Sequence, residues 1–106
     1  MVHDPIDLGY HHTVIFSRWA PDRDLNPQYA GLPDVDPWGL VVDHLKPDGT
    51  PCAGGCITFD TEVARQLYPG RARWTLESLE PLTVSPSLLC SCGDHGFIRG
   101  GRWVPA

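Results

Sequence analysis

The sequence predicts a single, mostly β domain of the α+β class, with short antiparallel strands, one short helix and a C-terminal hairpin. The chain has 106 residues, the length of one domain. It contains 11 prolines and 11 glycines, a combined share that favours many turns over a helical bundle. Several short segments alternate apolar and polar residues, as half-buried strands do. We expect residues 1–12 to form a flexible N-terminal arm and residues 13–106 to form the domain.

Two strands and a long loop are predicted in the N-terminal half. Thr13–Trp19 mixes β-branched and aromatic residues, and Trp38–Leu45 has the strongest strand pattern in the chain. Residues 20–37 between them are so rich in proline and aspartate that we expect a long loop. Loops of this length are usually functional or are held in place by contacts among their own side chains. Lys46-Pro-Asp-Gly49 has proline and Asp-Gly at the positions that a tight turn favours.

One helix is predicted, between two strand segments. Thr61–Leu67 can be capped by Asp60 or Thr61 at its start, and Pro69-Gly70 would end it. Strands are expected on either side, over Cys56–Phe59 and Arg73–Ser78.

The C-terminal third is predicted to end in a hairpin. Residues 97–99 and 102–104 flank Gly100-Gly101, a dipeptide that suits a two-residue hairpin turn. Before it, residues 81–85 are expected to be extended, and Ser85-Pro86-Ser87 to begin a turn or a single helical turn that leads into Leu88-Leu89-Cys90.

The net charge of −5 bears on the class of partner. Proteins that bind duplex phosphates usually carry the opposite charge balance, so nucleic-acid binding is disfavoured. Arg99 and Arg102 on the hairpin leave a weaker nucleic-acid-binding alternative. The sequence has neither an apolar run of about 20 residues, which a membrane span needs, nor the pattern of a signal peptide. We therefore expect a cytoplasmic protein that does not act on membranes.

Two cysteine clusters predict one structural zinc ion. The first is Cys52 with Cys56 in a glycine-rich loop, and the second is Cys90 and Cys92 with His95. Structural zinc takes four tetrahedral ligands, usually from separate loops, so these five candidates compete for four positions. Cys92 and His95 are favoured by their C-x2-H spacing and Cys52 comes next, while Cys56 and Cys90 compete for the last place.

Other interpretations of these residues remain open. Free cysteines also pack as small apolar side chains, and in an oxidising compartment four cysteines would form two disulfides. A catalytic zinc would need an open position and a nearby base. Asp94 could be that base, but an aspartate beside a glycine is more typical of a turn, so we assign no catalytic residue.

The remaining histidines and the tryptophans have plainer interpretations. His11 and His12 are more typical of a solvated pair or a pair at a sheet edge than of a metal site. His44 alternates with Val42 in a strand pattern, and we interpret it as a half-buried histidine rather than as a metal ligand. The four tryptophans suit a core or an interface. As a functional surface, the acidic loop 20–37 would suit a basic protein partner.

The stretch Leu82–Val104 (LTVSPSLLCSCGDHGFIRGGRWV) resembles the C-terminal signature of an uncharacterised family of small Cys/His-containing proteins common in actinobacterial phages. His12–Gln28 and Trp38–His44 are also similar to that family. A broader bacterial family of unknown function has a similar plan, in which a Cys-rich loop precedes a Ser-Pro-Ser segment and a Cys-x-x-His before an aromatic hairpin. This chain departs from that plan in a shorter gap before Cys92 and in the extra Cys90.

The resemblance implies zinc binding and a phage setting in a bacterial host cytoplasm, without an established activity. We therefore expect a non-enzymatic, zinc-binding phage accessory protein that binds a host or phage macromolecule, most simply a protein. One alternative is a zinc-dependent hydrolase or transferase that uses His95, Asp94 and His11 or His12. The other is the nucleic-acid-binding module with Arg99 and Arg102.

Overall fold

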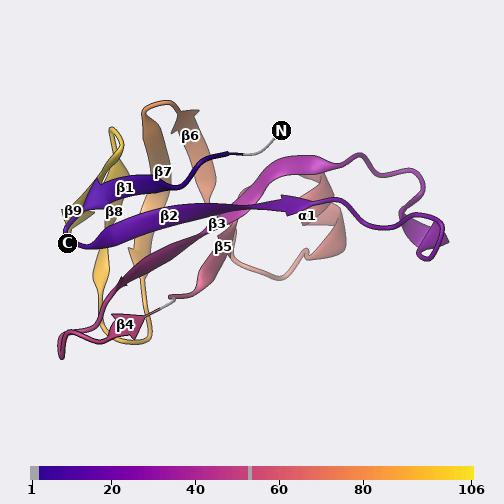
Figure 1. Cartoon of the computed structure of the whole chain (residues 1–106). Coiled ribbons are helices and arrows are strands. Elements are labelled where there is room, and N and C mark those ends of the chain that lie inside the picture. The colour runs from indigo at the N-terminus through magenta and orange to yellow at the C-terminus, as the bar shows by residue number, and fades with distance from the viewer. Residues whose placement is uncertain (1–2, 53) are drawn as a thin grey trace.

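The computed structural model describes residues 3–52 and 54–106, which form two antiparallel sheets and one short α-helix (Figure 1). The first sheet contains β1 to β5, and the second contains β6 to β9 in chain order. Strands dominate the described residues, which confirms the predicted mostly β, α+β class. No helix in this part of the chain is long and apolar enough to cross a membrane.

The centre of the first sheet is a long hairpin of β2 (His12–Trp19) and β3 (Val35–Leu45). Both strands were predicted, but β3 begins three residues earlier than the sequence pattern indicated. Its extension pairs with β2 through Trp19 and Val35, after a bulge that follows Ser17. Two short strands, β4 (Pro51–Cys52) and β5 (Cys56–Thr58), pair with β3 on its other side.

The N-terminal segment differs from the expected flexible arm. Ile6–Gly9 forms β1, which pairs with β2, and Leu8 is only 3% exposed. The two-residue turn that follows has positive φ angles at Tyr10 (52°) and His11 (59°). Only Ile6 and Leu8 carry the apolar alternation of this strand, and such a short pattern is hard to recognise among polar neighbours.

The second sheet is a meander of four strands: β6 (Thr75–Leu79), β7 (Leu82–Leu89), β8 (His95–Arg99) and β9 (Arg102–Pro105). The predicted C-terminal hairpin is confirmed, with Ile98 opposite Trp103. Ser85-Pro86-Ser87, where a turn was expected to begin, is instead part of β7. Its register with β8 shifts between Val84 and Leu88, and such an irregularity lets a strand contain a proline, here Pro86.

The predicted helix is confirmed as α1 (Glu62–Leu67). The Thr61 side chain accepts a hydrogen bond from the Ala64 N–H at 3.1 Å and so caps the helix start. Val63 and Ala64 are buried against the body of the protein. A 3-10 turn, η1 (Pro27–Tyr29), is the one further helical segment that the described residues contain, and it lies within the predicted long loop.

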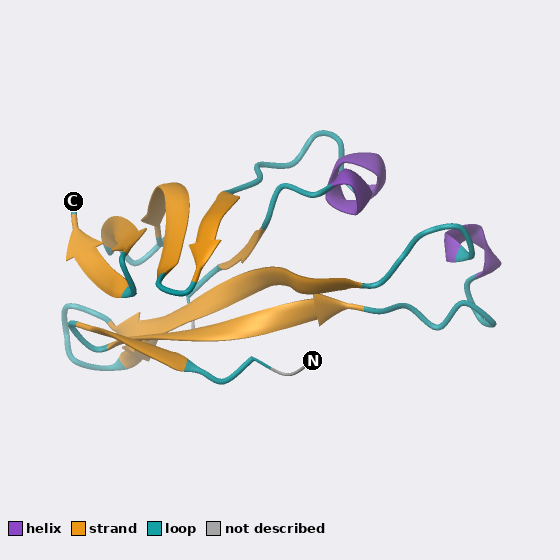
Figure 2. Ribbon diagram, turned by 90° about the horizontal axis from the view of Figure 1, so that it is seen from above, coloured by secondary structure: helices purple, strands orange, loops and turns teal. Residues whose placement is uncertain are grey.

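The hydrophobic core lies between the two sheets, which close around it. An isolated bridge between Phe59 and Trp74 links the end of β5 to the start of β6, and β1 lies beside β9 at the opposite edge. Beyond this core the β2–β3 hairpin projects as a long ribbon (Figure 2). The buried core side chains come from both sheets: Leu8, Val14, Leu40, Val42, Ile57, Phe59, Leu82, Val84, Leu88, Ile98 and Trp103.

Candidate metal centre

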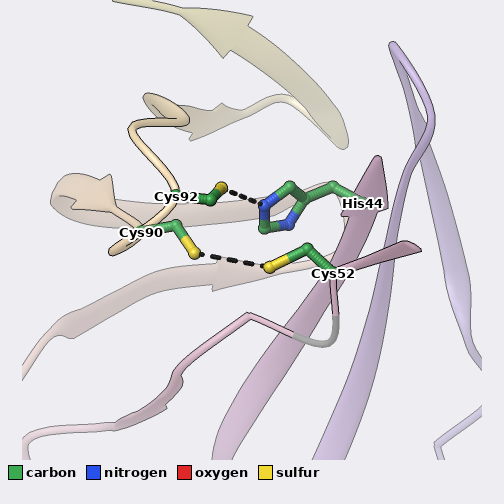
Figure 3. A group of neighbouring side chains, drawn as sticks. All are labelled: His44, Cys52, Cys90 and Cys92. Carbon is green, nitrogen blue, oxygen red and sulfur yellow. Dashed lines mark hydrogen bonds between the residues drawn. The ribbon is translucent and has the colours of Figure 1, made fainter. Parts of the chain in front are cut away.

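Four side chains that could ligate a metal ion converge between the two sheets: His44, Cys52, Cys90 and Cys92 (Figure 3). Their donor atoms all lie within 4.8 Å of one another. His44 and Cys52 come from the first sheet, on β3 and β4, while both other cysteines follow β7 of the second sheet. Three thiols and one imidazole can hold a metal ion, and this donor set is compatible with zinc.

The distances within the cluster fit coordination better than a disulfide. The Cys52 and Cys90 sulfurs are 3.8 Å apart, whereas a disulfide bond is about 2.05 Å long. Two thiolates bound tetrahedrally to zinc at about 2.3 Å have their sulfurs about 3.8 Å apart. The His44 Nε2 atom lies 3.1 Å from the Cys92 sulfur, and all four cysteines are free thiols.

His44 is held in the tautomer that a metal ligand needs. Its side chain is buried, and its Nδ1 lies 3.0 Å from the Val42 carbonyl oxygen, which can only accept a hydrogen bond. Nδ1 therefore carries the proton, and the lone pair of Nε2 faces the three thiols. Gly54 makes room for this arrangement, because a Cβ there would lie 2.5 Å from the same carbonyl oxygen.

The loop from Cys90 to Asp94 folds tightly around its two thiols. The Cys90 N–H donates to the Asp94 carbonyl at 2.8 Å, and the Gly93 N–H donates to the Cys90 carbonyl at 2.9 Å. Gly93 has a φ of +96°, a conformation that favours glycine. The turn in this glycine-containing segment thus places both sulfurs on one side of the loop (Figure 3).

Backbone N–H groups of this loop also act on the thiols. The Cys92 N–H donates to the Cys90 sulfur and, against the opposing effect of burial, lowers the pKa of Cys90 from 9.0 to about 7. The Asp94 N–H lowers the pKa of Cys92, but burial and hydrogen bonds with Cys90 and Cys52 outweigh it, so that pKa is raised. Zinc binds the thiolate form, which N–H donors stabilise.

The cluster includes three of the five ligands considered from the sequence and leaves out Cys56 and His95. Cys56 is exposed on β5, where its neighbour Ile57 points into the core. His95 is exposed on β8, and its Nε2 lies 3.0 Å from the Ser87 hydroxyl. Successive side chains on a strand point to opposite faces, so each of these residues lies on the face opposite to its buried neighbour.

His44 takes the place that sequence reasoning gave to His95. The sequence contained one relevant signal, the two-residue alternation of Val42 and His44, which places this histidine on the core face of its strand. What it did not contain was the pairing of β3 with β4, which sets His44 opposite Cys52.

A second group of donors adjoins the first and consists of His12, His44 and Asp94. The His12 Nε2 atom lies 2.7 Å from Asp94 Oδ2, and the same oxygen is 3.9 Å from His44 Nε2. His12 is 5% exposed, whereas its neighbour His11 is exposed. The expected solvated or edge pair therefore describes His11 alone.

A cavity of about 120 Å³ lies beside the cluster, between the two sheets. His44, Cys90 and Asp94 contribute its polar wall, and apolar side chains such as Trp74 and Leu88 line the rest. Cys56, which is not one of the four clustered donors, is also among the lining residues.

Comparison with protein-family models, with curated proteins and with solved structures found no match for this chain. The features of the domain that bear on function are therefore its candidate metal centre and its exposed surfaces.

Proposed function

We propose that this protein is a non-enzymatic binding module built around one structural zinc ion. The observation that supports this most is that His44 and Cys52, in the first sheet, converge with Cys90 and Cys92, in the loop that follows β7 of the second sheet. Four protein ligands complete a tetrahedral zinc site and leave no position for a reacting water. That is the arrangement of a structural zinc site rather than of a catalytic one.

The position of the cluster indicates what the ion would do for the fold. The paired strands β3 and β4 carry His44 and Cys52, and the loop after β7 carries Cys90 and Cys92. One ion would therefore join the two sheets directly, beside the cavity that lies between them. Domains of this size have a thin stability margin, and a structural zinc contributes free energy on the order of 10 kcal/mol to folding.

The surface proposed to bind a partner is the far end of the β2–β3 ribbon (Figure 2). Aromatic rings follow one another there: Trp19 lies 5.5 Å from Tyr29 and 5.8 Å from Trp38 between ring centroids. The ring of Trp38 is in turn 6.3 Å from Tyr68, which is 41% exposed. Half-exposed aromatic side chains are frequent anchors of protein interfaces.

The residues around these rings suit a basic protein partner. Leu25, at the tip of the ribbon, is 79% exposed, and Asp22 and Asp24 beside it are exposed as well. The nearby bases Arg18 and Arg23 are already paired with Asp34, at 2.9 and 2.8 Å. We propose that the partner is a host or phage protein in a bacterial cytoplasm, where reducing conditions keep the thiols available for zinc.

The zinc proposal is tested by native mass spectrometry of the protein produced in zinc-containing medium. We expect one zinc ion per chain, and loss of the cooperative thermal transition after a strong chelator removes the ion. A metal-free chain with the same fold and stability would contradict the proposal.

The partner surface is tested by affinity capture from a bacterial lysate with the wild type and with Leu25→Asp. Leu79→Asp is the matched control, because Leu79 is also exposed (39%) but lies on β6, in the other sheet. We expect Leu25→Asp alone to lose a stoichiometric, salt-sensitive protein partner. Retention of that partner by Leu25→Asp would place the interface elsewhere, and recovery of nucleic acid instead would favour the hairpin arginines.

A second candidate function, a zinc-dependent hydrolase or transferase, is favoured by the cavity beside the cluster. Its polar wall contains Asp94 together with two of the four proposed ligands. X-ray absorption spectroscopy separates the two functions, because a structural site has three sulfur ligands and one nitrogen ligand. An additional oxygen ligand from water would favour the enzyme.

A further inference from the structure

The pair formed by His12 and Asp94 contacts the metal cluster without belonging to its four donors. We propose that His12 and Asp94 are positioning residues that hold the zinc ligands in place and so determine how tightly the site binds zinc. This inference rests on the proposed function, since it takes the cluster of His44 and three cysteines to be a zinc site.

Asp94 contacts three of the four proposed ligands. Its carbonyl accepts the hydrogen bond from the Cys90 N–H, and its own N–H donates to the Cys92 sulfur. Its carboxylate oxygen Oδ2 lies 3.9 Å from His44 Nε2. The conformation of this one residue therefore affects the loop that carries two thiols and the face of the imidazole ligand.

His12 fixes the carboxylate of Asp94 from the other sheet. Its Nε2 is 2.7 Å from Asp94 Oδ2, and its Nδ1 is 2.6 Å from the Tyr10 carbonyl oxygen. Its ring stacks with Trp103, at 4.2 Å, and with His44, at 5.3 Å between centroids. With both ring nitrogens engaged and the side chain buried, His12 has little freedom to move.

The backbone that carries His12 adopts an unusual conformation. Tyr10 and His11 both have positive φ angles, which non-glycine residues rarely adopt. Such conformations cost free energy and persist where the surrounding contacts maintain them, often at functional sites. Here the turn brings the Tyr10 carbonyl to the imidazole that holds Asp94.

The expected effect follows from the known role of groups around metal ligands. Side chains that orient the ligands typically change metal affinity about 10–100-fold when they are removed. Because His12 acts through Asp94, removing both residues should cost little more than removing one, which is the signature of a coupled pair.

The experiment measures zinc affinity by competition with a chromophoric chelator for the full chain and its variants. We expect His12→Ala and Asp94→Ala to bind zinc about 10–100-fold more weakly, and the double variant to resemble either one. Asp94→Asn should recover part of the affinity, because its amide can still form a hydrogen bond with His12 Nε2. His95→Ala is the matched control and should bind zinc like the wild type.

A second readout separates positioning from general stability. The visible spectrum of the Co²⁺-substituted protein reports ligand geometry, and we expect it to change in Asp94→Ala but not in His95→Ala. If the His12 and Asp94 variants bound zinc within twofold of the wild type and kept the same spectrum, the positioning role of the pair would be overturned, while the zinc site itself would stand. A wild type that binds no zinc would overturn the zinc site as well, and variants unfolded at saturating zinc would show that the pair serves only the core.

Discussion

His44 and Cys52 lie directly opposite each other across the β3–β4 ladder, so that one residue pair of the first sheet supplies half of the candidate metal centre. The turn between them is closed by the Gly49 N–H, which donates to the Lys46 carbonyl at 2.8 Å, and by the Lys46 N–H, which donates to the Thr50 carbonyl at 2.8 Å. Local strand pairing thus preforms this half of the site. The other half, Cys90 and Cys92, reaches it only when the two sheets pack.

Replacing one proposed ligand should unfold the domain. Cys92→Ser removes a thiolate whose bond to zinc is part of the folding free energy, so we expect loss of bound zinc and of the cooperative thermal transition. Cys56→Ser is the control, because Cys56 is exposed and outside the cluster. Circular dichroism during heating follows the thermal transition of both variants. A Cys92→Ser variant as stable as the wild type would contradict a structural zinc.

The two histidines considered as ligands can be told apart by substitution. We expect His44→Ala to lower zinc affinity by more than about 100-fold, because the lost ligand contributes more than the roughly 10–100-fold of a supporting group. His95→Ala should leave the affinity unchanged, since its side chain contacts Ser87 outside the cluster. Chelator competition at fixed pH measures both variants, and the reverse ranking would restore the ligand set favoured by the sequence.

Steric contact at Gly39 predicts a selective effect on stability. A Cβ added at Gly39 would collide with the Ile57 carbonyl, where β3 pairs with β5, whereas one at Gly31 would meet no atom within 4 Å. Gly39→Ala should therefore lower the free energy of unfolding by about 1–3 kcal/mol, as overpacking does, while Gly31→Ala should not. Chemical denaturation of both variants at saturating zinc checks this, and equal stabilities would argue against the β3–β5 pairing.

Acid should weaken the ion pairs around Asp60. Hydrogen bonds and charge from Arg65, with a further contribution from Arg73, lower the pKa of Asp60 below 3.8. Because the folded pKa is the lower one, the stabilisation is present above the unfolded pKa and is lost as the pH falls through the folded value. The wild type should therefore exceed Asp60→Asn in stability at neutral pH and match it in strong acid.

Thermal unfolding at several pH values, from neutral pH to strong acid, measures the difference in stability between the wild type and Asp60→Asn. We expect it to be small and to shrink in high salt, because the pair is exposed to solvent. Asp24→Asn in the exposed tip loop is the control. If the difference in stability between the wild type and Asp60→Asn grew as the pH fell, it would contradict a lowered pKa of Asp60 in the folded state.

Much of the fold could be predicted because its signals are local. Alternating apolar residues identified β2 and β3, the Thr61 cap identified α1, and Gly100-Gly101 identified the last hairpin. The elements that differed lacked such signals. β1 has too few alternating residues, and β7 contains Pro86, which reads as a turn until the irregular register with β8 is known.

By itself, the sequence determined that this is a mostly β domain and that Cys52, Cys90 and Cys92 belong to clusters of metal-capable side chains. Only the tertiary structure decided that His44, rather than Cys56 or His95, joins those thiols. The physical reason is that a ligand is selected by the direction of its side chain and by the pairing of its strand. Those depend on strand register and on the packing of two sheets, which residue spacing along the chain does not specify.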